Sequence, residues 1–180
     1  MGTINKIFGI GFHKTGTKTL QGSLEILGYR VCGPRQDLLP LVKQGRYRGV
    51  FDVVERYDAF QDNPWPMLYK ILDLEYPGSK FILTVRDEEK WIKSVVNYFG
   101  DKETSMRKWI YGLGSPKGNE ELYINTFKKH NSDVKRYFLN RPDDLLVIDL
   151  TAGEGWEMLC SFLEKNQPRE PFPHFNKGKY

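Results

Sequence analysis

Residues Gly11 to Thr19 combine glycines, hydroxyl side chains and two lysines, Lys14 and Lys18, within one short segment. Glycines let a backbone turn tightly, so that consecutive amide groups point at one anion. The helical pattern that follows adds the partial positive charge of a helix N-terminus. Further hydrogen-bond donors are the hydroxyls of Thr15, Thr17 and Thr19. This combination predicts a loop that binds a phosphate group, in preference to a glycine turn that only packs a helix.

The position of the lysines departs from the common ATP-binding pattern G-x-x-x-x-G-K-[ST]. Gly11 and Gly16 have the required spacing, but Thr17 stands where lysine should follow, and Lys18 comes one place late. ATPases use that lysine and the adjacent hydroxyl for the terminal phosphates and for magnesium. A kinase that uses ATP or GTP is therefore the competing enzyme class, with 145–149 as the strand that would carry its magnesium-binding aspartate.

A second candidate anion site follows residues 80–85, an almost continuous apolar run that ends at Arg86. A planar guanidinium offers two parallel hydrogen bonds to phosphate oxygens. Ser94 follows about two helical turns later, and so lies on roughly the same face of the expected helix as its start. The competing interpretation is a strand-end arginine that pairs with Asp87 or Glu88.

Together, these two motifs resemble those of sulfotransferases that use 3′-phosphoadenosine 5′-phosphosulfate (PAPS). The pattern [Lys/Arg]-[Ser/Thr]-Gly-Thr after the first strand resembles their 5′-phosphosulfate loop, and Arg86 with Ser94 resembles the pair that holds the 3′-phosphate. Further similar motifs, spread over nearly the whole chain, are Tyr76-Pro77-Gly78, Trp91, Gly153-Glu154-Gly155-Trp156 and Phe172-Pro173-His174.

The resemblance implies an enzyme that moves a sulfuryl group from PAPS to a hydroxyl or amine by in-line transfer. Adenosine 3′,5′-bisphosphate (PAP) would be the product, and no metal would be needed. Lys14 takes the place of the catalytic lysine, and Lys177 reaches over the 3′-phosphate unless it belongs to a solvated terminus. The residues expected to bind the donor are His13, Lys14, Thr15, Gly16, Thr17, Lys18, Thr19, Arg86, Ser94 and Lys177.

Such a transfer needs a general base that removes the proton of the acceptor. Asp62 is the first candidate, because it follows a weak strand at 57–60 and precedes a proline turn, where a carboxylate could face the cleft. A turn or helix-capping aspartate is nearly as common at such a position. Asp58 and Glu55 are weaker candidates.

The chain has three histidines. His13 lies within the loop, and its side chain either contacts the ligand or points away from it. His130 fits the exposed face of a helix, and His174 fits a role in ordering the C-terminal tail.

The elements that must position these residues alternate between strand and helix. Apolar runs predict strands at 6–10, 29–32, 57–60, 80–86 and 145–150. Periodicity and capping residues predict a helix that ends at Gly28 and helices at 37–44, 65–76, 87–99, 120–139 and 154–165, with Asp37 as an N-cap. The alternation predicts an α/β three-layer sandwich, a central parallel sheet flanked by helices, similar to P-loop nucleotide-binding folds. Ligands of such sheets bind beyond the carboxyl ends of the strands.

Residues 100–118 show no regular pattern, and we expect them to form part of the acceptor cleft, lined by Tyr98, Trp109 and Tyr111. The acceptor itself is expected to be a small molecule or a carbohydrate. A non-catalytic nucleotide-binding protein of the same fold is the second alternative to the sulfotransferase.

Length and composition set the outer limits. A chain of 180 residues fits one domain, 1–180. The net charge of +4 weakly favours an anionic ligand, while no run of Lys and Arg indicates nucleic acid. Two cysteines without a C-x-x-C pair argue against a zinc site and for a reducing compartment. We expect a cytoplasmic protein, because no signal peptide or membrane-length apolar run is visible, and no motif sets the oligomeric state.

Overall fold

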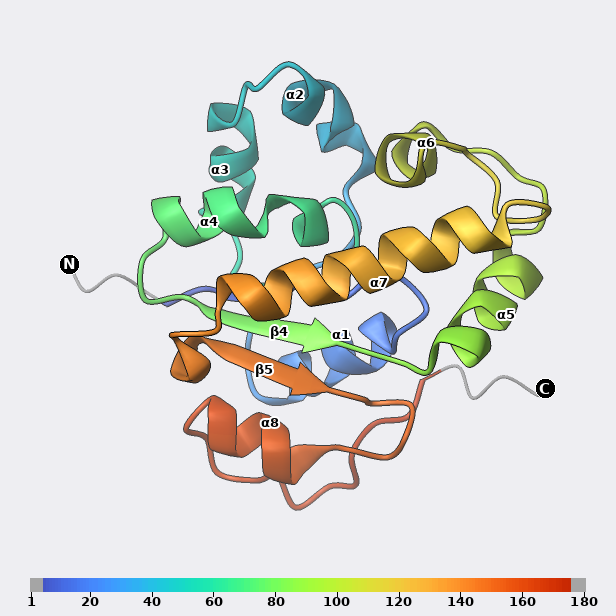
Figure 1. The fold of residues 1–180 in the computed structure, drawn as a ribbon. Helices are drawn as coiled ribbons and strands as arrows, with labels where there is room; N and C mark the ends of the chain where they lie inside the picture. The colour runs from blue at the N-terminus through green and yellow to red at the C-terminus, as the bar shows by residue number, and fades with distance from the viewer. Residues whose placement is uncertain (1–4, 176–180) are drawn as a thin grey trace.

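A parallel sheet forms the centre of the computed structural model, which describes residues 5–175 (Figure 1). Its strands pair in the order β2-β3-β1-β4-β5, and each neighbouring pair is parallel. The strands are β1 (Ile7–Gly9), β2 (Val31–Cys32), β3 (Ala59–Phe60), β4 (Lys80–Thr84) and β5 (Leu145–Ile148). Each lies within a stretch that the apolar pattern predicted. The predicted α/β class, a central parallel sheet flanked by helices, is confirmed.

Two layers of helices cover the two faces of this sheet (Figure 1). Neighbouring side chains of a strand point to opposite faces, so Ile7 and Phe8 belong to different apolar clusters. On the face of Ile7, α1 (Thr17–Ile26) and α8 (Trp156–Phe162) pack on the sheet. The opposite face is covered by α2 (Leu39–Lys43), α3 (Arg48–Val54), α4 (Tyr69–Glu75) and α7 (Glu120–Tyr137).

A third apolar cluster supports the loop that follows β1. Helices α5 (Glu88–Phe99), α6 (Ser105–Tyr111) and the first half of α7 pack around Phe12 and Trp91, which are both fully buried. The indole of Trp91 also donates a hydrogen bond to the carbonyl of His13 at 2.9 Å. The backbone of the loop is therefore held by the core of a neighbouring layer.

The prediction that residues 100–118 are irregular is wrong, because α6 lies within them. Thr104 caps this helix through a hydrogen bond from the amide of Arg107 at 3.2 Å. The buried guanidinium of Arg107 donates to the carbonyl of Gly114 at 2.9 Å and lies 4.3 Å from the ring centroid of Phe99. A helix of seven residues is marginal by itself, so these contacts with residues just outside the helix account for its formation.

The segment between β2 and β3 also differs from the prediction. Asp37 caps no helix and instead pairs with Arg35 at 2.6 Å, within the 3₁₀ turn η1 (Gln36–Leu38) that precedes α2. Helix α3 was not predicted. Near its end, the buried Nζ of Lys6 donates to the carbonyls of Val54 and Tyr57 at 3.1 and 2.7 Å.

The predicted helix at 65–76 divides into the 3₁₀ turn η2 (Trp65–Leu68) and α4. Among residues 5–175, no helix has the length and apolar character that a membrane span requires.

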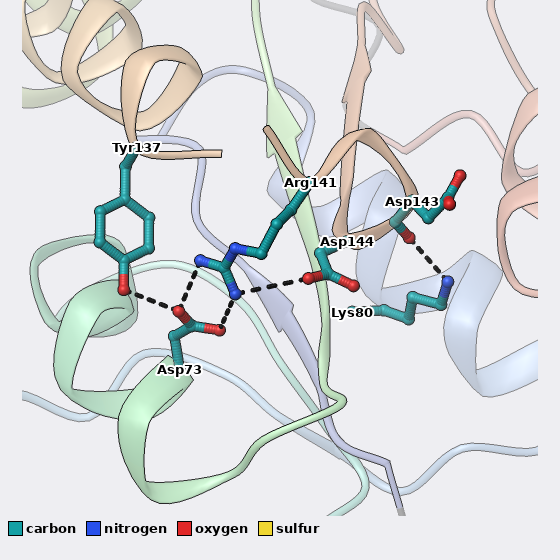
Figure 2. Close-up of polar contacts among 6 residues, drawn as sticks. All are labelled: Asp73, Lys80, Tyr137, Arg141, Asp143 and Asp144. Carbon is teal, nitrogen blue, oxygen red and sulfur yellow. Dashed lines mark hydrogen bonds and ion pairs between the residues drawn. The ribbon is translucent and has the colours of Figure 1, made fainter. Parts of the chain in front are cut away.

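A network of charged side chains joins elements at the amino ends of the strands (Figure 2). Arg141 makes two hydrogen bonds to Asp73 of α4, at 3.0 and 2.7 Å, and the hydroxyl of Tyr137 donates to the same carboxylate at 2.7 Å. Lys80, at the start of β4, donates to the carbonyl of Asp143 at 2.7 Å, in the turn η3 (Pro142–Asp144). These contacts tie α4 and the end of α7 to the edge of the sheet opposite to the predicted ligand site.

Candidate functional site

A cavity of about 440 Å³ lies where the chain leaves β1, β4 and β5. The loop after β1 and the start of α1 line it with Lys14, Gly16, Thr17, Lys18 and Thr19. Arg86 and Ser94 line it after β4, residues 150–153 after β5, and His174 and Phe175 from the C-terminal segment. Because β1 lies between β3 and β4, this is the point where the strand order changes direction, the usual ligand position in such sheets.

The loop after β1 is fixed to β4 at close range. A Cβ atom placed at Gly11 would collide with Thr84, so only glycine fits there. The hydroxyl of Thr15 lies 2.6 Å from the carbonyl of Phe12 and 2.5 Å from the hydroxyl of Thr84. Thr15 is fully buried and does not line the cavity. Its side chain therefore locks the loop to the sheet instead of facing a ligand.

Helix α1 begins with its N-terminus open to the cavity. Gly16 is its N-cap, with φ of 95°, and no side chain caps the amides of the first turn. Such amides attract an anion, and the helix dipole adds to the attraction. The lining also carries Lys14, Lys18 and Arg86 and, within residues 5–175, no carboxylate. These three cations make the cavity electropositive.

Arg86 lines this cavity and carries one unsatisfied hydrogen-bond donor. Its Nη1 donates to the carbonyl of Lys14 at 3.0 Å, whereas its buried Nε has no hydrogen-bond partner in the part of the chain that the structure describes. Asp87 instead caps α5 through the amide of Lys90, and Glu88 pairs with Lys128 at 3.0 Å. The alternative that Arg86 pairs with a neighbouring carboxylate therefore finds no support in these contacts. A second cavity, of about 520 Å³, lies on the other side of Arg86, between the start of α5 and α7.

Lys14 adopts a left-handed backbone conformation, with φ of 65°. Its ammonium lies 4.0 Å from the ring centroid of Tyr98, which is 67% exposed on α5. Tyr98 lies one helical turn beyond Ser94, so α5 contributes both a cavity residue and an aromatic contact for Lys14. The other two aromatic residues expected at an acceptor cleft pack inward: Trp109 contacts the core, and Tyr111 stacks on Tyr123 with centroids 3.9 Å apart.

The C-terminal segment forms a wall of the cavity. The amide of Phe175 donates to the hydroxyl of Thr19 at 3.3 Å. A Cβ atom at Gly22 of α1 would collide with the ring of Phe175, so this glycine provides the space into which the ring fits. His174 lines the cavity beside it. Lys177, a predicted donor residue, lies outside the described residues.

Asp62 lies close to the start of α1, as its predicted role requires. Its carboxylate accepts hydrogen bonds from the hydroxyl of Thr17 at 3.3 Å and from the amide of Asn63 at 2.8 Å. Burial raises the pKa of Asp62, although these hydrogen bonds and the charges of Lys18 and Lys14 act in the opposite direction. A carboxylate whose pKa is raised is a better proton acceptor than an ordinary one.

The weaker base candidates lie elsewhere. Asp58 precedes β3, at the amino end of the sheet, and pairs with Arg30 at 2.9 Å. The hydrogen bond from Arg30 is the main reason that the pKa of Asp58 falls to about 2. Glu55 follows α3 and is exposed. Neither contacts the loop after β1 through the hydrogen bonds and ion pairs of the described residues.

Two histidines support the loop from inside the protein. The ring of His13 is buried between Asn63 and Tyr111 and does not line the cavity. The prediction that His130 is exposed is wrong: it stacks on Phe12, and its Nε2 lies 2.7 Å from the carbonyl of Ile10. Burial lowers the pKa of His130 to about 4. The periodicity of the sequence predicted that His130 lies on a helix. It could not predict that the loop after β1 packs against that side of the helix.

Sequence reasoning missed several residues of the site. Residues 150–153 follow β5, and that position beyond a buried strand is the signal that could have identified them. Tyr111 was expected at a cleft and instead holds His13. Within residues 5–175, no group of three or more His, Cys, Asp or Glu side chains could hold a metal ion.

Comparisons with known proteins agree with this architecture. A family model described as a sulfotransferase domain matches residues 6–119 and 103–180. A protein of Aspergillus versicolor, described as "Ava biosynthesis cluster protein M", is 26% identical over 212 residues, which cover 94% of this chain and 80% of that protein. Because the family model spans nearly all of the sequence, the chain belongs to the sulfotransferase domain family, whose general chemistry is sulfuryl transfer.

Proposed function

We propose that the protein is a sulfotransferase that uses PAPS as donor and binds it in the cavity of about 440 Å³. The 5′-phosphosulfate would lie at the open N-terminus of α1, held by Lys14, Thr17, Lys18 and Thr19. The 3′-phosphate would lie at Arg86 and Ser94. We also propose that residues 1–180 act as one unit, that the protein is cytoplasmic, and that the acceptor is a small molecule or a carbohydrate.

The observation that carries this proposal is the state of Arg86. Arg86 borders the same electropositive cavity as the loop after β1, and its buried Nε has no hydrogen-bond partner among the described residues. A buried donor without an acceptor costs free energy, so an anionic oxygen of the ligand is the natural partner. ATP has no 3′-phosphate for this second position, which favours a 3′-phosphorylated donor.

In the proposed transfer, the loop after β1 would stabilise the leaving group and the loop after β3 would provide the general base. The donor supplies a sulfuryl group on a good leaving group. As the bond between sulfur and the acceptor oxygen or nitrogen forms, the bond between sulfur and the bridging oxygen breaks. The ammonium of Lys14 would stabilise the negative charge that develops on the departing phosphate oxygen. The carboxylate of Asp62 would accept the proton of the acceptor.

The exposed ring of Tyr98 marks the side from which the acceptor would approach. It lies beside Lys14 and outside the cavity lining, so its outer face is available to a second substrate. This placement supports an acceptor that packs against an aromatic ring. His13 and Thr15 would support the donor through the backbone of the loop, since their side chains point inward.

Calorimetric titration with PAP, ADP and ATP with magnesium tests the proposed donor. We expect PAP to bind most tightly, and Arg86→Ala to weaken its binding by roughly 10²-fold, because the variant removes a charged partner of a phosphate. Arg48→Ala is the matched control, since Arg48 is 92% exposed and lies on α3, far from the cavity along the fold.

Tighter binding of ATP with magnesium would refute the PAPS assignment and favour the kinase. Tight binding of PAP without release of PAP from PAPS, in the presence of a panel of alcohols, phenols, amines and sugars, would favour the non-catalytic alternative.

A further inference from the structure

The ring of His13 joins three segments that are far apart in the sequence. Its Nδ1 lies 3.1 Å from the side-chain nitrogen of Asn63, in the loop after β3. Its Nε2 lies 3.2 Å from the hydroxyl of Tyr111, at the end of α6. The ring is buried, with 4% of the residue exposed, and the indole of Trp91 binds the His13 carbonyl. One side chain thus connects the loop after β1 with two other parts of the cleft.

The orientation of the Asn63 amide decides which ring nitrogen of His13 carries the proton. The amide turns its Nδ2 to the ring, while its buried Oδ1 has no hydrogen-bond partner among the described residues. An amide nitrogen can only donate, so in this orientation Nδ1 is an acceptor, and a rotated amide would reverse the tautomer. Nε2 then carries the proton and donates to the oxygen of Tyr111. Burial, together with the nearby charges of Arg107 and Lys14, lowers the pKa of His13 to about 3. The ring is therefore neutral throughout the pH range in which the protein would work.

The two residues that need a fixed geometry are the immediate neighbours of this contact. Lys14 follows His13, and Asp62 precedes Asn63. Lys14 and Asp62 both adopt left-handed backbone conformations, with φ of 65° and 66°. Residues other than glycine keep such conformations only where their surroundings hold them. Arg86 holds the carbonyl of Lys14, and the hydrogen bond between His13 and Asn63 links one strained residue to the other.

We propose that His13 is a positioning residue that fixes Asp62 relative to Lys14 through Asn63, as a neutral ring protonated at Nε2. Its imidazole neither contacts the donor nor transfers a proton. This inference rests on the proposed function, because Lys14 and Asp62 are there assigned the two roles in transfer. The contact with Tyr111 is secondary: it anchors α6 to the same ring, whereas the contact with Asn63 sets the distance between the two reacting groups.

Two substitutions separate the two contacts of the ring. The side-chain oxygen in His13→Asn lies near the position of Nδ1 and can accept from Asn63, but the variant loses Tyr111. The side-chain nitrogen in His13→Gln lies near the position of Nε2 and can donate to Tyr111, but the variant loses Asn63. Both remove the same aromatic ring, so each is the packing control for the other.

The readout is the pKa of the Asp62 carboxyl, followed by ¹³C NMR of labelled aspartate. Asp62 faces Thr17 and Lys18 of α1, Lys14 of the loop and, more remotely, Tyr111 of α6. We expect a raised pKa in the wild-type protein and in His13→Asn. In His13→Gln, the pKa should fall toward the ordinary carboxyl value, because Asp62 gains water once Asn63 is released.

The affinity for PAP is measured by calorimetry in the same variants, and it separates this inference from the proposed function. We expect the two variants to bind PAP equally, because both lose the same ring from the donor loop and differ only in which contact, with Asn63 or with Tyr111, they keep. An unchanged Asp62 pKa in His13→Gln would overturn the positioning role even if PAP binds tightly. Failure of the wild-type protein to bind PAP would instead refute the proposed donor and leave the Asp62 result interpretable.

A measurement on the unaltered protein keeps the inference testable if either variant fails to fold. In ¹⁵N NMR of labelled histidine, His13 should show a protonated Nε2, an unprotonated Nδ1 and no titration between about pH 5 and pH 8. A proton on Nδ1, or titration near the ordinary histidine value, would contradict the assignment.

Discussion

Among the individual residues, the charged carboxylate of Asp62 destabilises the folded protein, and the hydrogen bonds of its neighbours offset this only in part. Burial raises its pKa, so the charged form is disfavoured in the folded protein despite hydrogen bonds from Asn63 and Thr17. A base held in this way accepts a proton more readily, at the expense of stability. The folded state therefore binds a proton more tightly than the unfolded chain does, and stability is lost as pH rises through the folded-state pKa.

Asp62→Asn should separate these two effects. We expect the transfer rate to fall by roughly 10²-fold, because asparagine cannot accept the proton. The melting temperature at pH 7 should rise, because the variant no longer buries a charge, and the gain should shrink as pH falls below the Asp62 pKa. Thermal denaturation at pH 4 and pH 7 checks the sign, with Asp101→Asn on the exposed surface as the control. A lower melting temperature at pH 7 would show that the carboxylate stabilises the fold instead.

Residue types and short spacings predicted part of the site. Arg86 and Ser94 reach the same cavity as the loop after β1, because their positions depend only on the end of a strand and the pitch of one helix. The inward direction of His13 and the burial of His130 depend on contacts with Asn63 and Ile10, which are 50 and 120 residues away. No periodicity within one element contains that information.

Among the elements, α1 both borders the cavity and holds the C-terminal segment in place. Its N-terminus opens to the cavity, while Gly22 in its middle receives the ring of Phe175. Glycine costs a helix interior about 1 kcal/mol relative to alanine. In this helix, that cost makes room for the C-terminal segment, which forms a wall of the cavity.

Gly22→Ala tests whether this docking supports ligand binding. Alanine favours the helix but collides with Phe175, so we expect PAP to bind about tenfold more weakly, equivalent to about 1.4 kcal/mol. Phe175→Ala should weaken binding similarly, and the double variant should be no weaker than Phe175→Ala alone. Calorimetry provides the affinities. Gly33→Ala is the control, because its Cβ would lie 3.4 Å from Gln61, an ordinary contact. Independent, additive losses would show that Gly22 acts by some route other than Phe175.

The predicted elements agree with the structure where the local sequence carries a strong pattern, such as an apolar run or a capped helical periodicity. All five strands of the described sheet are apolar runs, and α5 has both a capping aspartate and a clear periodicity. Helices α3 and α6 have seven residues each and were missed. Their formation depends on contacts with residues outside each helix. Lys6 binds carbonyls near the end of α3, and Arg107 of α6 binds the carbonyl of Gly114 in the loop that follows. Asp37 was assigned as a cap from its type, but Arg35 two residues earlier binds its carboxylate instead.

Across the whole molecule, the two ends of the sheet have different tasks. The carboxyl ends of the strands carry strained backbone, an unsatisfied arginine nitrogen and the half-buried carboxylate of Asp62, none of which favours stability. The amino ends carry the network of Asp73, Tyr137 and Arg141, in which both carboxylate oxygens of Asp73 accept hydrogen bonds (Figure 2). This division indicates that the amino ends of the strands stabilise the fold, while the carboxyl ends remain available for a ligand.

Asp73→Asn tests that division. Burial alone raises the pKa of Asp73, but hydrogen bonds from Arg141 and Tyr137 outweigh it and lower the pKa below the ordinary value. The stabilisation is therefore present above the ordinary carboxyl pKa and is lost as pH falls. We expect the variant to lose about 2 kcal/mol of unfolding free energy at pH 7, measured by urea denaturation, and to approach the wild type near pH 3.

The affinity for PAP should stay the same in Asp73→Asn, because the network and the cavity lie at opposite ends of the strands. Tyr137→Phe removes one hydrogen bond from the same carboxylate and should lose about 1 kcal/mol, again without an effect on PAP. A loss of PAP affinity that follows the loss of stability across the two variants would contradict the division. It would mean that the sheet transmits strain from its amino end to the loop after β1, and that Lys14 and Arg86 depend on the whole scaffold for their geometry.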